Sequence, residues 1–393
     1  MKVNGHVCPV ELTVLQCAAS RHRLSVPNST SKPDESRPKT RRAGDAPTLA
    51  DVARAAGVSK MTASLALNGS QNSVRVSAVT RERVMAAAEQ LRYRPNPIAR
   101  ALSSKRTNTI GFITTLMGEK PNAYLLEVFG GVIQGAMAAQ RTTTVFTLGS
   151  WDEAPTRIPA WCDGRVDGII VLAPRLEDAE EAWLLERTPI VTVHASGNWR
   201  MGSVNFEADD EAGAYEMVQR MFALGHRNIL HVGGPVGFPS ADRRVEGYLR
   251  AHAAVGLTPT PVLRVPFNTA GGAEGMEDWL QRHRGQPLPE AVFGGSDAIA
   301  VGCMETLEAR GLDIPRDISV VSFDHTWLGR TLHMAAVRQP LHEMGQQAVE
   351  VLVQLIEASG AEPYAGPRNI VLLPEIVMGR TLAEPHRAPL LIA

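Results

Sequence analysis

The chain has 393 residues, of which 44% are hydrophobic and 21% are charged, and no apolar run approaches the ~20 residues of a membrane span. Length and composition thus exclude a membrane-spanning or wholly disordered chain and allow two or three globular domains. The net charge of −1 hides an uneven distribution, because residues 1–107 carry 18 Lys and Arg against 7 Asp and Glu, and the remainder 22 against 34. A basic front on an acidic body indicates a polyanion-binding module joined to a second part.

The first 46 residues precede the predicted folded part. Their early apolar stretch is interrupted by Pro9 and Glu11, so we do not expect a signal peptide. Residues 21–47 are rich in Ser, Pro, Arg and Lys, and we predict a disordered tail over residues 1–46.

The cysteines show no metal-ligand spacing. We therefore expect buried or incidental thiols in a reducing compartment, the cytoplasm, and no metal site at Cys8, Cys17, Cys162 and Cys303.

Two short helices with a tight turn are predicted next. Thr48 is placed to cap a helix over residues 49–56, which Gly57 closes. Ser59 is placed to cap a second helix, which ends at Asn68 and Gly69.

A third helix completes a helix-turn-helix unit over residues 47–94. Ser77 is its expected N-cap, and Val84, Ala88 and Leu91 form its apolar stripe. The alternative is a small helical cap on a larger domain. Ten Lys and Arg against three acidic residues in residues 48–107 favour the DNA-binding interpretation.

The second helix carries apolar side chains on two faces. We expect one face to pack on the module, through Ala63, Ala66 and Leu67. In a helix-turn-helix the opposite face meets base edges in the major groove, where apolar groups can contact thymine methyls. The predicted DNA contacts of the module are Thr48, Ser59, Lys60, Met61, Thr62, Ser64, Leu65, Asn68 and Arg94.

Residues 95–107 predict a conditional hinge helix. Asn96 can cap a helix that starts at Pro97 and ends at residue 102 or 103, which is too short to be stable alone. Leu102 is the bulky apolar side chain that could wedge between base pairs in a minor groove. The predicted contacts here are Asn96, Ala99, Arg100 and Leu102, with Lys105 and Arg106 near phosphates. A plain interdomain linker is the alternative.

Residues 108–382 read as two α/β lobes. Apolar runs alternate with helical stretches in two series, which predicts parallel strands covered on both faces and a ligand cleft at their carboxyl ends. The runs are "TIGFITTL", "TTTVFTLG", "VDGIIVLAP" and "PIVTVH", then "NILHVGG", "PVLRVPF", "AVFGGS" and "ISVVSFD". Because of Pro155 and Pro159, we expect a short or irregular connection in "SWDEAPTRIPAW". Residues 383–393 are assigned to a C-terminal tail.

In this order, several segments resemble the lac repressor type (LacI/GalR family) of bacterial transcription regulators. They include "TLADVARAAGVSKMTASLALNG", "ALGHRNILHVGG", "GSDAIAVG" and "GLDIPRDISVVSFD", and the match covers roughly residues 47–381. The resemblance implies a helix-turn-helix head and a two-lobed, periplasmic-binding-protein-like effector domain. It also implies a homodimer on a near-palindromic double-stranded DNA operator, controlled by a small molecule such as a sugar or sugar derivative. The C-terminus lacks heptads, which favours a dimer over a tetramer.

The family's cleft residues map onto Arg244, Ser296, Asp297 and Asp324. Ser296 stands where Asn is common, and His194 stands where many sugar-binding members have Asp, which puts the usual sugar chemistry in doubt. Asp324 could instead cap a turn, and His194 could be a structural strand-end residue. Possible stacking walls, or packing residues, are Tyr124, Trp199 and Trp327, and we expect Arg243 to be a solvated neighbour.

Two departures concern the DNA-binding residues. Leu65 stands where the family often has a hydrogen-bonding side chain, so the operator should differ at that base pair. Leu102, in contrast, matches the minor-groove leucine of the family.

Two other classes of function fit the sequence less well. A periplasmic solute-binding protein would explain the lobes, but it predicts a signal peptide and no basic helical head. An enzyme would need a nucleophile with its base, a metal cluster or a phosphate loop, and "GGPVGFPS" lacks the Lys-Ser/Thr of a P-loop. We therefore expect neither a catalytic residue nor a cofactor.

Overall fold

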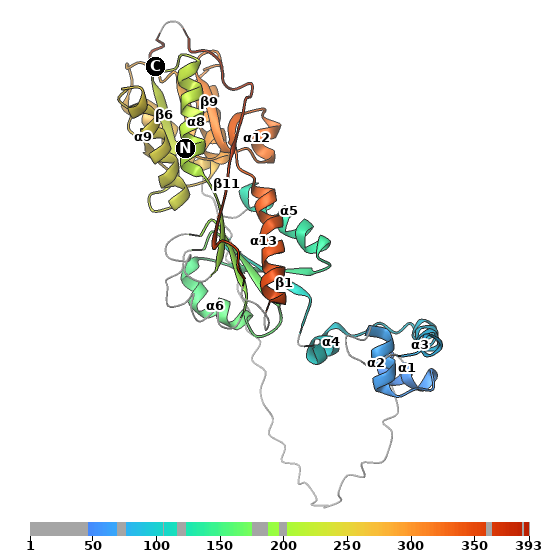
Figure 1. Cartoon of the computed structure of the whole chain (residues 1–393). Helices are drawn as coiled ribbons and strands as arrows, with labels where there is room; N and C mark the ends of the chain where they lie inside the picture. The colour runs from blue at the N-terminus through green and yellow to red at the C-terminus, as the bar shows by residue number, and fades with distance from the viewer. Residues whose placement is uncertain are drawn as a thin grey trace, which may run out of the picture. The chain divides into compact units, whose positions relative to one another are not determined.

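The computed structural model describes residues 46–68, 76–104, 106–115, 123–174, 188–195, 203–358, 364–386 and 389–392. They fall into two compact units, Met1–Arg94 and Pro95–Ala393 (Figure 1). Apart from Ala46, the predicted tail lies outside the described residues, as do Cys8 and Cys17.

The first unit is the predicted three-helix module, formed by α1 (Leu49–Ala55), α2 (Lys60–Asn68) and α3 (Ala78–Gln90). The expected caps are present, because Ser59 Oγ accepts from the backbone N–H of Thr62 at 3.0 Å and Ser77 Oγ from that of Thr80 at 3.2 Å. At the start of α1, the Asp51 carboxylate accepts from the backbone N–H of Thr48 at 2.9 Å.

Small side chains fill the core of this module. Ala63 and Ala66 of α2 are buried against α1 and α3, as predicted, and Leu67 packs on the same cluster. The predicted stripe of α3 is wrong at Leu91, which is 36% exposed because it lies at the C-cap of the helix. Ala87 lies beside Val84 and Ala88 in the core instead.

The second unit begins with α4 (Pro97–Ser104) and continues into a first lobe with an all-parallel sheet in the order β11-β5-β4-β3-β1-β2. Its strands are β1 (Thr109–Thr115), β2 (Thr142–Leu148), β3 (Gly168–Leu172), β4 (Ile190–Val193), β5 (Val204–Ala208) and β11 (Asn369–Leu372). One face is covered by α5 (Ala123–Ala138) and α13 (Leu341–Glu357), and the other by η1 (Trp151–Glu153) and α6 (Ala154–Trp161).

The second lobe has a sheet in the order β12-β10-β9-β8-β6-β7, in which only β12 runs antiparallel to its neighbour among the described strands. Its strands are β6 (Ile229–Gly233), β7 (Leu263–Arg264), β8 (Ala291–Gly294), β9 (Ser319–Asp324), β10 (Ala335–Arg338) and β12 (Glu375–Val377). One face packs on α10 (Thr269–Arg282) and α11 (Asp297–Ala309), the other on α8 (Asp210–Ala223) and α9 (Pro239–Ala254), and α12 (Trp327–Thr331) follows β9.

The chain passes between the lobes three times, after β5, after β10 and after β11. Each of the eight predicted apolar runs contains a strand, but β5, β10, β11 and β12 were not predicted. β11 and β12 are short and half-exposed, so their sequences lack a continuous apolar run.

The expectation of an irregular connection at residues 150–161 is wrong, because α6 forms there. Pro155 lies in its first turn, where the missing N–H has no intrahelical partner to lose. Pro159 stands inside the helix, which continues to Trp161 while Ala154 and Ile158 are buried against the sheet.

The helices α5 and α13 lie side by side at very close range (Figure 1). A Cβ on Gly131 would come within 2.0 Å of the His342 carbonyl oxygen, and one on Gly345 within 2.3 Å of the Val128 carbonyl oxygen. Glycine at these positions lets the two backbones touch, which fixes α13, the returning helix, on the first lobe.

The end of the chain is attached to the second lobe. The backbone N–H of Leu288 donates to the Leu390 carbonyl at 2.7 Å, and Ile392 is buried in the cluster beneath α10 and α11. Among the described helices, none is long and apolar enough to cross a membrane.

Candidate functional site

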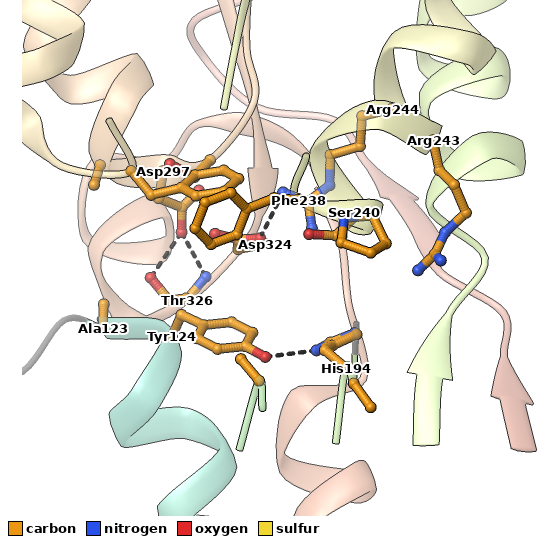
Figure 2. A pocket seen from close by; sticks show the side chains of 16 residues that line it. Ala123, Tyr124, His194, Phe238, Ser240, Arg243, Arg244, Asp297, Asp324 and Thr326 are labelled. Carbon is orange, nitrogen blue, oxygen red and sulfur yellow. Dashed lines mark hydrogen bonds and ion pairs between the residues drawn. The ribbon is translucent and has the colours of Figure 1, made fainter. Parts of the chain in front are cut away.

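A cavity of about 100 Å³ lies where the two lobes of the second unit face each other (Figure 2). The first lobe contributes Ala123, Tyr124, Ala173, His194 and Ala195. The second lobe contributes Phe238, Pro239, Ser240, Arg243, Arg244, Phe267, Ser296, Asp297, Ala298, Asp324 and Thr326. Most of these residues follow the carboxyl end of a parallel strand, where open α/β sheets bind their ligands.

Arg244 of α9 is held on every side and is only 4% exposed. Its Nε and Nη2 each lie 2.9 Å from Asp210 Oδ1, and its Nη1 donates to the Gly295 carbonyl at 2.5 Å. Asp324 Oδ1 lies 3.6 Å from Nη1, and the guanidinium carbon stands 3.9 Å above the ring of Phe323. The guanidinium of Arg244 is therefore already bonded to acceptors within the protein, which the sequence could not show.

Arg243 lines the cavity, so its expected place as a solvated neighbour is wrong. Its Nη2 donates to Asp210 Oδ2 at 2.8 Å, and its Nη1 lies 3.4 Å from Glu207 of the first lobe. Glu207 also accepts from the Asn369 amide at 2.8 Å. Because Asp210 and Glu207 are buried, Arg243 is drawn inward and bridges the two lobes.

Asp297 lines the cavity, but its carboxylate is occupied by the neighbouring loop. Its Oδ1 accepts from Ser322 Oγ at 2.6 Å, and its Oδ2 accepts from the backbone N–H and the hydroxyl of Thr326 at 2.6 and 2.7 Å (Figure 2). Ser296 caps α11 by accepting from the Ile299 N–H at 3.2 Å. These two residues hold the rim of the cavity in place.

Asp324 ends β9 with a positive φ of 98° and directs its carboxylate into the cavity. Burial raises the pKa of Asp324 to about 7, against the opposing effect of Arg244 and with a further increase from Asp297. Gln339 Nε2 donates to its Oδ1 at 2.6 Å. Asp324 therefore lines the cavity, and its role as a hydrogen-bond acceptor for a ligand stays a prediction.

Tyr124 and His194 form a pair on the first-lobe side of the cavity (Figure 2). Tyr124 Oη lies 2.5 Å from His194 Nδ1, and His194 Nε2 lies 3.3 Å from the backbone N–H of Ala208. Burial lowers the pKa of His194 to about 4 and raises that of Tyr124, so both groups are uncharged at neutral pH.

The aromatic walls differ from those predicted. Phe238 and Phe267 line the cavity as an edge-to-face pair with ring centroids 5.8 Å apart. Trp327 is 49% exposed and is not among the lining residues, whereas Trp199 lies outside the described residues. Phe238 lies only six positions before Arg244 in the chain, and this nearness in sequence to an expected cleft residue could have predicted it as a lining residue.

A second contact between the lobes lies beside the cavity, between α5 and α12. Glu127 Oε1 accepts from the backbone N–H of Trp327 at 2.8 Å and from Arg330 Nη2 at 2.6 Å. Because Trp327 directly follows Thr326, this contact joins the first lobe to the rim of the cavity.

In the first unit, Lys60 and Met61 project from α2 away from the core, and Met61 is 73% exposed. Ser64 and Leu65 are half-buried, and Leu65 is outside the core cluster. Thr48, Ser59 and Arg94 are exposed and Thr62 is half-buried. The side chain of Asn68 lies outside the described part of the chain. The predicted groove-facing and packing faces of α2 are thus distinct, and the DNA contacts themselves stay a prediction.

The hinge residues are placed on or beside α4, where Asn96, Ala99 and Arg100 are exposed. The Asn96 carbonyl accepts from the Arg100 N–H at 3.1 Å. The side chain of Leu102 lies outside the described part of the chain, so its wedge role stays a prediction. Within the described residues, no group of three or more His, Cys, Asp or Glu side chains could hold a metal ion.

Comparison with known proteins matches both units. The model for bacterial regulatory proteins of the lacI family matches residues 48–96, and the model for periplasmic binding protein-like domains matches residues 218–382. The ribose operon repressor of Haemophilus influenzae is 30% identical over 343 residues, which cover 85% of this chain and 98% of that protein. The chain belongs to the LacI family.

Other LacI-family relatives match over their whole lengths. The transcriptional repressor PurR of Vibrio vulnificus is 30% identical over 351 residues, 86% of this chain and 99% of that protein. The lac repressor dimer bound to operator and an anti-inducer matches with a TM-score of 0.72 at 25% identity, covering 86% of this chain and all of that one. A complex of the regulator CelR with cellobiose matches with a TM-score of 0.60 at 25% identity, covering 85% and 99%.

This LacI-family protein is a DNA-binding transcription regulator with a helix-turn-helix head and an effector-binding domain of two α/β lobes. Its family consists of transcription regulators and not of enzymes.

Proposed function

We propose that this protein is a homodimeric repressor that binds a near-palindromic operator in the bacterial cytoplasm and responds to a small molecule in the interlobe cavity. The observation that carries the proposal is the presence, in one chain, of a helix-turn-helix head and a walled polar cavity between two lobes. The lac repressor dimer bound to its operator supports this arrangement.

In the proposed complex, α2 enters the major groove. Lys60 and the exposed Met61 approach base edges, while Ala63 and Ala66 keep the helix on the module. Each subunit reads one half-site, and Leu102 of α4 wedges into the minor groove between the half-sites. The proposed divisions are a head over residues 47–94, a hinge over 95–107, an effector domain over 108–382 and a tail over 383–393.

The effector is proposed to occupy the cavity lined by Tyr124, His194, Arg244 and Asp324. One water molecule needs about 10–15 Å³ of a cavity measured in this way, so a cavity of about 100 Å³ has room for a small molecule. No catalytic step is proposed for the cavity.

Movement of the lobes is proposed to control the hinge. Arg106 at the end of the hinge donates to the Ile356 carbonyl of α13 at 3.3 Å, so the hinge is tied to the helix that packs on α5. Tyr124 at the start of α5 lines the cavity. A coupling of about 1–3 kcal/mol, or about 5–150-fold in operator affinity, is the expected scale.

The test is a selection of DNA sites from a random pool with the full-length protein, followed by binding of the selected site with and without candidate small molecules. We expect a near-palindromic site whose affinity changes when one compound also raises the melting temperature. Absence of any sequence preference over random competitor DNA would refute the proposal. Leu102→Ala should weaken operator binding and leave the thermal response to the compound unchanged.

A further inference from the structure

The cavity also indicates the chemical class of its ligand. We propose that the effector is a small uncharged ring compound that accepts a hydrogen bond from Tyr124 and lies against Phe238 and Phe267. This inference rests on the proposed function, since it concerns the same cavity. It separates neutral sugars, lactones and nucleobases from sugar acids and sugar phosphates.

The charge balance of the cavity opposes an anion. Among the described lining residues, the permanent cations are Arg243 and Arg244, and both are already paired. Arg244 meets Asp210 twice at 2.9 Å, and Arg243 meets Asp210 at 2.8 Å and Glu207 at 3.4 Å. A carboxylate or phosphate would therefore have to share these guanidiniums with the buried carboxylates that already pair with them.

The remaining titratable groups of the described lining also oppose the binding of an anion. His194 is neutral, and the Asp297 carboxylate would repel an anionic ligand. Asp324 adds to this repulsion only when it is ionised, because burial raises its pKa to about 7. Asp297 is held by Ser322 and Thr326, so it cannot turn away. The lining can thus accept hydrogen bonds from a ligand at Asp324, but it offers no unpaired cation to an anion.

The Tyr124–His194 pair presents a donor to the ligand. The Ala208 N–H can only donate, so His194 Nε2 accepts and the hydrogen of the neutral ring is on Nδ1. Nδ1 therefore donates to Tyr124 Oη across 2.5 Å, which leaves the phenolic hydrogen for a second partner. No other partner of Tyr124 Oη is present among the described residues, and the hydroxyl lies at the cavity, so a ligand acceptor is its natural partner.

The apolar side of the lining suits the face of a ring. Phe238 and Phe267 both line the cavity, with their rings at 81° to each other. A flat heterocycle or the CH face of a sugar gains contact there, whereas a charged group would lose hydration without compensation.

The experiment uses the full-length protein and matched probes that differ in charge: glucose, glucuronate and glucose 6-phosphate; ribose and ribose 5-phosphate; and neutral lactones and purine bases. Thermal unfolding and calorimetry measure binding. We expect at least one uncharged member to bind and to exceed every anionic member by at least 10-fold in affinity. Binding of an anionic member as tightly, or the absence of binding by every uncharged member, would overturn the inference. Sequence-specific DNA binding, measured in the same preparations, would then still uphold the proposed regulator.

Two variants test the separate parts of the argument. Tyr124→Phe keeps the ring and removes the donor, and should lower the affinity for the neutral ligand about 10- to 100-fold, since a buried acceptor loses its partner. Glu207→Gln releases Arg243 from one carboxylate and should raise the affinity for an anionic probe several-fold. Tyr364→Phe is the control, because it removes a hydroxyl from a tyrosine that is not part of the lining. Unchanged affinity for the neutral ligand in Tyr124→Phe would show that Tyr124 donates no hydrogen bond to it. Unchanged affinity for the anionic probe in Glu207→Gln would show that pairing of Arg243 with Glu207 does not oppose anion binding.

Discussion

Asp210 is the buried carboxylate that pairs with both Arg243 and Arg244, so Asp210→Asn should destabilise the effector domain strongly. Asp210 is fully buried at the first residue of α8 and receives Arg244 Nε, Arg244 Nη2 and Arg243 Nη2 within 2.9 Å. Removing one partner of a buried ion pair costs about 3–5 kcal/mol. Asn keeps one acceptor oxygen, and Glu207 and Asp324 still face the two arginines. We therefore expect the lower end, about 3 kcal/mol, which for a domain of this size is about 6 °C in melting temperature.

Differential scanning calorimetry of the full-length protein measures this loss. Asp278→Asn is the matched control, because Asp278 pairs with Arg282 at 2.5 Å on an exposed face of α10. That variant should shift the melting temperature by only about 1 °C. Equal shifts in the two variants would show that burial of the Asp210 pairs does not decide their contribution. Non-specific DNA binding by the head should be the same in both.

Four further predictions concern other parts of the chain. Burial lowers the pKa of His231 to about 4, below its unfolded value near 6.5, so the neutral ring contributes its full share of the folding free energy above pH 6.5 and loses it as the pH falls towards 4. Denaturant unfolding at pH 7 and pH 5 should therefore show that the free energy of unfolding falls by about 2 kcal/mol less in His231→Asn than in the wild type. Gly131→Ala should lower the free energy of unfolding in urea by about 2–3 kcal/mol, because its Cβ would lie 2.0 Å from a backbone oxygen. Gly130→Ala is the control and should be tolerated, because its Cβ would first meet a side chain at 3.4 Å. Equal effects of the two substitutions would contradict the close contact between α5 and α13. Leu65→Arg should shift the selected operator towards guanine at one base pair by about 1–3 kcal/mol, and identical selected sites would exclude a base contact at this position. Glu127→Ala should speed amide exchange of Trp327 about 5- to 10-fold, and unchanged exchange would show that the contact between α5 and α12 is not maintained in solution.

Residue types in the sequence predicted several of the side chains that line the cavity, but not which of them are already paired. Family resemblance pointed to a set of cleft positions that all line one cavity: His194, Arg244, Ser296, Asp297 and Asp324. Tyr124, expected as a possible stacking wall, lines the same cavity. The guanidinium of Arg244 is already paired, because Asp210, 34 positions away in the chain, lies against it. No local pattern marks Asp210 as its partner, since an acidic residue in the first turn of a helix is common on electrostatic grounds alone.

One of the strands that were not predicted, β5, shows why a sequence pattern can miss a buried strand. β5 carries the buried polar residues Asn205 and Glu207, and both bond to Asn369 of β11. Asn205 Nδ2 donates to Asn369 Oδ1 at 3.0 Å, and Asn369 Nδ2 donates to Glu207 Oε1 at 2.8 Å. Polar residues interrupt the apolar run that identifies a buried parallel strand. Their burial is possible only because a distant segment of the chain returns to pair with them.

The amino-acid sequence alone determined what depends on nearby residues: three capped helices, a basic head, an exposed apolar side chain on the second helix, and eight apolar runs that became strands. Tertiary structure decided which lobe the last helix and strands join, where Arg243 points, which carboxylates are already paired and which aromatic rings form the wall. Those outcomes depend on contacts between residues far apart in the chain. Their energies come from burial and charge pairing, which exist only once the two lobes have closed around them.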